Sequence, residues 1–181
     1  MHPGRLVLED GVLTPTWSHT EASFLTRSAS VAVHQGEWLF SGGWLEGGGG
    51  LYALSPDGED DTLLTTLTGG EGEAVISTSM WSDDESAYFA ASLWESANVL
   101  AGLPEGEVDL EEVAQFQVVD DDTTENLGAA LLLLPGSGGD GIPDLLVSDP
   151  GRDKGTFSGV YQSGSAIALF GSQYTDNIRP A

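Results

Sequence analysis

The sequence predicts an all-β fold of β-propeller-like blades, each a four-stranded antiparallel sheet, in about three repeats. Three observations predict it. Few segments show the 3.6-residue periodicity of an amphipathic helix. The apolar segments are short and end at Gly, Pro, Asp or Ser. One pattern of two strands, a variable loop and a third strand recurs three times along the 181 residues. About a dozen short strands with tight turns are typical of a sandwich, barrel or propeller, and the repeat favours the propeller.

The expected strands follow one another at short intervals. The clearest is Val113–Val119, where Ala114, Phe116 and Val118 share one face and the two glutamines share the other, as in a half-buried strand. Residues 108–112, just before it, also fit a single helical turn. The other strands are expected at Arg5–Leu8, Ser28–Val33, Glu37–Ser41, Leu51–Leu54, Leu63–Leu67, Glu73–Ser77, Ala87–Ala91, Asn98–Ala101, Ala129–Leu134, Asp144–Val147 and Ser165–Phe170.

The repeat places Leu39, Phe89 and Leu146 about 50 and 57 residues apart, the length of one four-stranded blade with variable loops. Three blades do not close a ring, which takes four to eight. The chain is therefore a part of a longer propeller, one of several copies that assemble into a ring, or an open arc. Arg5–Leu8 is a candidate outer strand for a missing or closing blade. Within a single domain spanning 1–181, the repeats cover approximately residues 24–68, 69–120 and 124–175.

The third repeat contains a Leu127-Gly128 pair, then an Asp- and Gly-rich loop, then Ser148-Asp149-Pro150. In this order they resemble the Phe-Gly opening, the calcium loop and the Gly-Ala-Pro of an FG-GAP repeat, the blade unit of integrin-α-like β-propellers. Ser165–Gly171 matches the closing strand, so the resemblance covers about 45 residues. The first two repeats share only strand spacing and small residues with this pattern. Gly50–Gly58 is also similar to a quinoprotein-like repeat.

The resemblance implies a calcium loop, in which side-chain oxygens come from loop positions one, three, five and nine and a carbonyl from position seven. The matching residues are Asp140, Ile142 and Asp144, whereas Gly136 and Gly138 occupy positions one and three. Two carboxylates and one carbonyl fill about half of a calcium shell. Two interpretations remain: a weak or lost Ca²⁺ site, or a metal-free turn in which the two aspartates bond backbone amides.

Trp44 and Trp94 follow the second strand at equivalent places in the first two repeats. Two loop aromatics on one propeller face would form a platform on which a sugar or peptide stacks. The alternative is that both indoles pack against the next blade. Between them lies Gly47–Gly50, which lacks the Lys-Ser/Thr of a phosphate-binding loop and is expected to be a flexible connection.

The ratio of basic to acidic residues excludes some classes of binding partner. The chain has 5 basic and 29 acidic residues, a formal net charge of −24, so it has no basic patch for nucleic acid or anionic lipid. A solvated acidic surface, weak cation binding and a basic partner remain as explanations of the acidity. Without cysteine it forms no disulfide and no thiolate metal site. Its longest apolar run, Ala129–Pro135, is too short to span a bilayer. Met1–Arg5 shows no signal-peptide pattern.

These features predict a non-enzymatic binding or adhesion module, extracellular or at the cell surface, with a protein or glycan ligand. No catalytic residue is assigned, because there is no Gly-x-Ser-x-Gly elbow and the 29 acids make any carboxylate pair unspecific. One alternative is the propeller domain of a secreted hydrolase or lyase, with loop acids as catalysts. Another is a purely structural repeat segment. The sequence also predicts that the chain forms a homo-oligomer or is a part of a longer chain.

Overall fold

The all-β prediction is confirmed. The computed structural model describes residues 4–9, 12–18, 29–44, 47–54, 61–69, 73–83, 85–94, 96–119, 127–150 and 164–171. Within these ranges the chain forms strands β1 to β14 and one short helix, α1. The strands build a hairpin and three larger sheets, called sheets 1, 2 and 3 in chain order, and each sheet is open.

Sheet 1 is an antiparallel meander extended by one parallel strand. Its first turn, Gln35-Gly36, has φ angles of 51° and 84°, the left-handed pair that a two-residue hairpin requires. The parallel strand corrects the expected four-stranded antiparallel blade. It comes from the segment between the third and fourth strands of sheet 2 and pairs with the free edge of β6. The order is β10 (Gly106–Asp109), β6 (Asp61–Thr68), β5 (Gly49–Leu54), β4 (Glu37–Gly43), β3 (Ala29–His34).

Sheet 2 has the four antiparallel strands that the repeat predicts, but its first strand lies later than expected. The predicted strand Glu73–Ser77 is wrong, because the strand runs over Ser77–Ser82 and is rich in hydroxyl side chains. The fourth strand begins at Phe116, because α1 (Leu110–Val113) occupies the start of the predicted Val113–Val119 strand. The order is β11 (Phe116–Val119), β9 (Ser96–Ala101), β8 (Ala87–Ser92), β7 (Ser77–Ser82).

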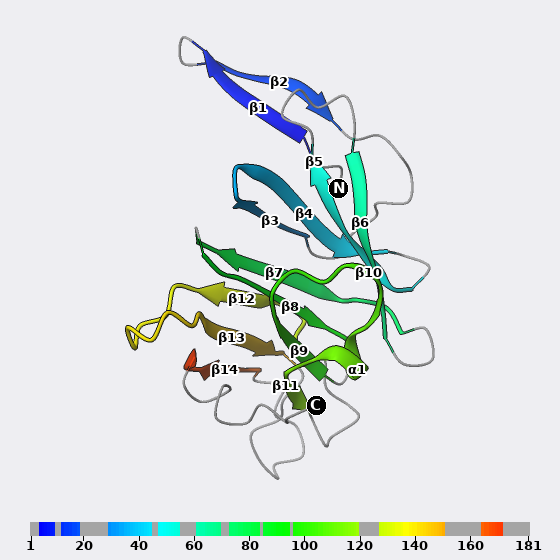
Figure 1. Cartoon of the computed structure of the whole chain (residues 1–181), viewed down its shortest axis with the longest axis vertical. Helices are drawn as coiled ribbons and strands as arrows, with labels where there is room; N and C mark the ends of the chain where they lie inside the picture. The colour runs from blue at the N-terminus through cyan, green and yellow to red at the C-terminus, as the bar shows by residue number, and fades with distance from the viewer. Residues whose placement is uncertain are drawn as a thin grey trace, which may run out of the picture.

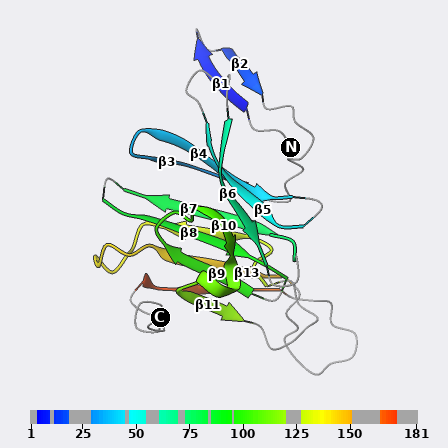
Figure 2. The ribbon, with the colours of Figure 1, turned by 45° about the vertical axis from the view of Figure 1, so that its right-hand side comes forward.

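Sheet 3 and the N-terminal hairpin complete the described strands. Sheet 3 has the order β12 (Leu131–Leu134), β13 (Asp144–Asp149), β14 (Ser165–Leu169), which are the three strands that the third repeat predicts. The predicted strand at Arg5–Leu8 is present as β1 (Gly4–Glu9), and it pairs with β2 (Val12–Ser18). In both views this hairpin stands beyond the ends of β5 and β6, apart from the stack (Figures 1 and 2).

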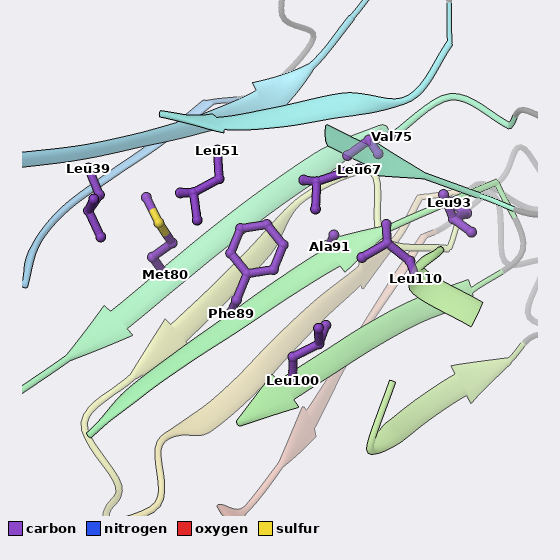
Figure 3. Close-up of a cluster of buried hydrophobic side chains, with 10 residues drawn as sticks. All are labelled: Leu39, Leu51, Leu67, Val75, Met80, Phe89, Ala91, Leu93, Leu100 and Leu110. Atoms are coloured by element: carbon purple, nitrogen blue, oxygen red, sulfur yellow. The ribbon is translucent and has the colours of Figure 1, made fainter. Parts of the chain in front are cut away.

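The three sheets stack face to face in chain order (Figures 1 and 2). Their first strands, β3, β7 and β12, lie next to one another, with β7 in contact with both others. Between sheets 1 and 2 lies an apolar cluster centred on Phe89, with Leu39 and Leu51 opposite it (Figure 3). Between sheets 2 and 3 lies a second cluster that includes Val99 and Leu145. Sheet 2 is therefore covered on both faces.

Serine hydroxyls join the first strands where a backbone ladder does not. Ser30 Oγ accepts from Met80 N at 3.0 Å, and Ser79 Oγ accepts from Leu133 N at 2.9 Å. Ser82 Oγ donates to Val33 O at 2.6 Å. Because an unpaired backbone group away from water costs free energy, these hydroxyls complete the edges of strands that have no direct partner there.

A glycine-rich crossing connects sheets 1 and 2. Gly48 N donates to Glu73 O at 3.0 Å, and Val75 N donates to Gly48 O at 3.2 Å. A Cβ at Gly43 would overlap the Val75 carbonyl oxygen, so only glycine permits this approach. The expected flexible connection over Gly47–Gly50 is therefore wrong, because Gly48 pairs with Ala74 and the next two glycines belong to β5.

Candidate functional site

Three hairpin turns lie together at one end of the stack, on its left in both views (Figures 1 and 2). They are the turns between β3 and β4, between β7 and β8, and between β12 and β13, at residues 35–36, 83–86 and 135–143. We call this end the turn edge. Acidic side chains gather in and beside these turns, which makes the turn edge a candidate binding surface: Glu37, Asp83, Glu85, Asp140 and Asp144.

The loop at 135–143 is organised by the two aspartates that the FG-GAP resemblance singles out. Asp144 begins β13; its Oδ2 accepts from Ser137 N at 2.9 Å and its Oδ1 from Gly171 N at 3.0 Å. Asp140 Oδ1 accepts from Ile142 N at 3.1 Å, an Asx turn. Both carboxylates therefore bond backbone amides, as the metal-free interpretation expects. The calcium site at Asp140, Ile142 and Asp144 stays a prediction.

The two glycines of the loop differ in what they can accept. A Cβ at Gly136 would overlap the Ile142 carbonyl oxygen, whereas a Cβ at Gly138 would lie 3.4 Å from Asp140 Oδ2, an ordinary contact. Gly136, at loop position one, therefore leaves no room for a side chain, whereas Gly138, at position three, leaves room for one beside the Asp140 carboxylate. Among the residues that the structure describes, no group of three or more His, Asp or Glu side chains is placed to hold a metal ion.

The turn between β7 and β8 is built in the same way. Asp83 Oδ1 accepts from Glu85 N at 2.9 Å and from Ser86 N at 2.6 Å. These amide bonds hold the pKa of the Asp83 carboxyl below its usual value. Asp83 therefore closes this turn through hydrogen bonds to its own carboxylate.

Replacing Asp144 with asparagine tests how the loop is held. Donation by the Ser137 backbone amide, with the Ser137 hydroxyl and the Gly171 amide, holds the pKa of Asp144 below its ordinary value of 3.8. A carboxyl with a lowered folded pKa stabilises the protein above its unfolded pKa, and loses that contribution as the pH falls through the folded pKa. We expect Asp144→Asn to lower the free energy of unfolding by about 1 kcal/mol at neutral pH.

Urea unfolding of both proteins across the acid range measures the difference, which should shrink below pH 3.8. Asp140→Asn is the matched control, because Asp140 makes one backbone bond in the same loop. A difference that stays constant into strong acid would contradict the role of the Asp144 charge.

The two predicted platform tryptophans lie at the other end of the sheets. Trp44 and Trp94 each follow the second strand of their sheet, whereas the turn edge precedes that strand. Trp44 packs on Phe40 and Tyr52 of its own sheet, and its Nε1 donates to Tyr52 Oη at 3.2 Å. Trp94 is 41% exposed. The tryptophans and the aspartate loop thus belong to opposite ends of the stack, and the stacking platform stays a prediction.

Comparison with known proteins assigns this chain to no family. No family model matches the chain, and no curated protein matches it either. In the described residues no helix is long and apolar enough to cross a membrane.

Proposed function

We propose that this chain forms three consecutive blades of an FG-GAP-like β-propeller and acts as a non-enzymatic binding module outside the cell. One observation carries the proposal: the three sheets stack face to face in chain order, with their first strands adjacent. Successive propeller blades have this relation, in which each blade buries one face against the previous blade and one against the next. Sheet 2 shows it fully, since apolar clusters cover both of its faces.

The turn edge is the proposed binding surface. The carboxylates of Asp83 and Asp144 accept hydrogen bonds from backbone amides, and these bonds hold the two turns in place without a ligand. A preordered surface saves the entropy that a mobile loop loses on binding. We propose a protein or glycan ligand that can bind to a negatively charged surface. A calcium ion would additionally stabilise the 135–143 loop.

A gain-of-function variant tests the FG-GAP assignment of the loop. Gly138→Asp adds a carboxylate beside Asp140 at the position that the FG-GAP pattern fills with an oxygen ligand. We expect calcium, but not magnesium, to raise the melting temperature of this variant relative to EDTA, and by more than in the natural chain. A ligand at a hundredfold excess over its Kd stabilises the folded state by about 2.7 kcal/mol.

Gly138→Ala is the control for this experiment, because it makes the same backbone change without the carboxylate. No calcium-specific shift in the aspartate variant would exclude an FG-GAP-type loop. The binding role is tested on glycan and protein arrays, with Glu37→Gln and Glu85→Gln together as the variant that removes turn-edge charge. Turnover of polysaccharides or esters by the pure protein would overturn the non-enzymatic assignment.

A further inference from the structure

The loop at 135–143 contains an Asp–Gly step, Asp140-Gly141, and both residues are exposed at the turn edge (Figure 1). We propose that Asp140 is a site of spontaneous modification, at which the chain converts this aspartate to isoaspartate through a cyclic imide. The reaction uses the two neighbouring residues and water, and it needs no enzyme or metal. This inference does not rest on the proposed function, because it involves neither the ligand nor the stack of blades.

The reaction proceeds in two balanced steps. The Gly141 nitrogen attacks the carboxyl carbon of Asp140, a new C–N bond forms, and the carboxyl hydroxyl leaves with the amide proton as water. Water then adds to the main-chain carbonyl of Asp140, the original peptide bond breaks, and the nitrogen regains a proton while it stays bonded to the former side-chain carbon. The product is linked through the β-carbon and carries a free α-carboxylate, so the mass and net charge of the chain are unchanged.

The Asx turn holds the two reacting atoms in one hydrogen-bonded ring. Asp140 Oδ1 accepts from Ile142 N at 3.1 Å, and the ring that this bond closes contains both the Asp140 carboxyl carbon and the Gly141 nitrogen. A donor on Oδ1 stabilises the negative charge that develops there when the nitrogen attacks. None of the described residues accepts a hydrogen bond from Gly141 N, so no such bond holds the nucleophile away from the carboxyl carbon.

Glycines flank the reacting carboxyl group, so it is reached without passing a side chain. A Cβ at Gly138 would lie 3.6 Å from Asp140 Cγ, and a Cβ at Gly136 would lie 3.1 Å from Asp140 Oδ1, but neither residue has one. Gly141 has a φ of 76°, a left-handed conformation that favours glycine, and open space surrounds the place where its Cβ would be. The nucleophile therefore carries no side chain that would hinder its approach.

The other aspartates in the described part of the chain lack this combination, because Asp140 alone among them is followed by glycine. Asp144, at the end of the same loop, precedes Leu145, which is 0% exposed in β13 and pairs with Leu169 of β14. Its carboxylate is also held by two backbone amides from different segments. Asp149 precedes a proline, which has no N–H to react. Asp144 is therefore an internal control for the same reaction.

Isomerisation would lengthen a loop that is closely packed. It inserts the Asp140 Cβ into the main chain, so the oxygen that accepts from Ile142 N no longer belongs to a side chain. The Ile142 carbonyl oxygen lies against both Gly136 and Gly171, where a Cβ on either glycine would meet it. Because the loop has so little room there, an added backbone atom must displace it. We expect faster hydrogen exchange at Ser137 N and Ile142 N in aged protein, since both amides donate to loop aspartates.

Incubation of the full chain for several weeks at mildly acidic pH, below its melting temperature, tests the proposal. A protease that cuts before aspartate but not before isoaspartate is used for digestion, and fragmentation mass spectrometry then identifies the linkage at each site. We expect isoaspartate to accumulate at Asp140 and not at Asp144. The steps Asp10-Gly11 and Asp57-Gly58 lie outside the described residues, and their peptides are analysed separately. An aged chain without isoaspartate at Asp140 would overturn the proposal.

Two comparisons show whether the folded loop itself permits the reaction. Because an exposed loop opens at almost no free-energy cost, we expect the rate at Asp140 in the folded chain to lie within about tenfold of the rate in guanidinium chloride. A greater slowing by the fold would mean that the Asx turn protects the step, and would overturn the proposal. Asp140→Glu is the matched variant, because it keeps the charge but lengthens the side chain by one carbon. Aged Asp140→Glu should show neither the modification nor the faster exchange at Ser137 N, and faster exchange there would contradict isomerisation as its cause.

Discussion

Phe89→Ala should lower the free energy of unfolding by about 3 to 5 kcal/mol. Phe89 is 0% exposed and lies between its cross-strand partners Met80 and Leu100, facing sheet 1 (Figure 3). Removing the ring leaves a cavity between two sheets that the rest of the cluster fills only in part. Because small domains are stable by only about 5 to 15 kcal/mol, this loss would bring the protein close to unfolding.

Urea denaturation with linear extrapolation measures this loss. Val113→Ala on α1 is the control, since Val113 is 42% exposed and its change should stay within about 0.5 kcal/mol. A loss of less than about 1 kcal/mol for Phe89→Ala would contradict tight packing between sheets 1 and 2.

Gly43→Ala should destabilise the protein by about 3 kcal/mol or more, although it adds a single methyl group. The new Cβ would overlap the Val75 carbonyl oxygen and lie 2.9 Å from the Val75 carbonyl carbon. Both are backbone atoms, so no side-chain rotation relieves the clash, and the strand end must separate from the crossing segment. The bonds between Gly48 and the crossing segment would weaken with it.

Thermal and urea unfolding measure this effect, with Gly138→Ala as the matched control. A Cβ at Gly138 makes only an ordinary contact, and its backbone is outside the left-handed region, so that change should be neutral or slightly stabilising. A Gly43→Ala protein as stable as the natural chain would show that the crossing does not lie against the end of β4 in solution.

The strands that sequence could predict are those whose own residues alternate or form an apolar run. β4, β8 and β13 are of this kind, and Phe116 and Val118 face the second cluster as the alternation predicts. β7 could not be found in this way, because its stability comes from distant partners. Its serines bond Gly128 and Leu133, 51 and 54 residues away, and no local pattern signals such contacts.

The candidate loop was predictable in its residues but not in its connections. The FG-GAP pattern pointed to Asp140 and Asp144, and the Asx turn at Asp140 is a local consequence of its sequence. The bond from Gly171 to Asp144 spans 27 residues and depends on how β14 pairs with β13. The closure of position one by the Ile142 carbonyl depends on the path of the whole loop.

The parallel strand β10 has a consequence for how the protein is made. The outer edge of sheet 1 is completed only when Gly106–Asp109 pairs with β6, and Thr68 then donates to Val108, 40 residues further along the chain. During synthesis the first repeat therefore emerges with an unprotected edge and waits for most of the second. Long-range parallel pairing of this kind is slow to form. The repeats are therefore not independent units. A chain that ended between the first and second repeats would lack β10, the outermost strand of sheet 1.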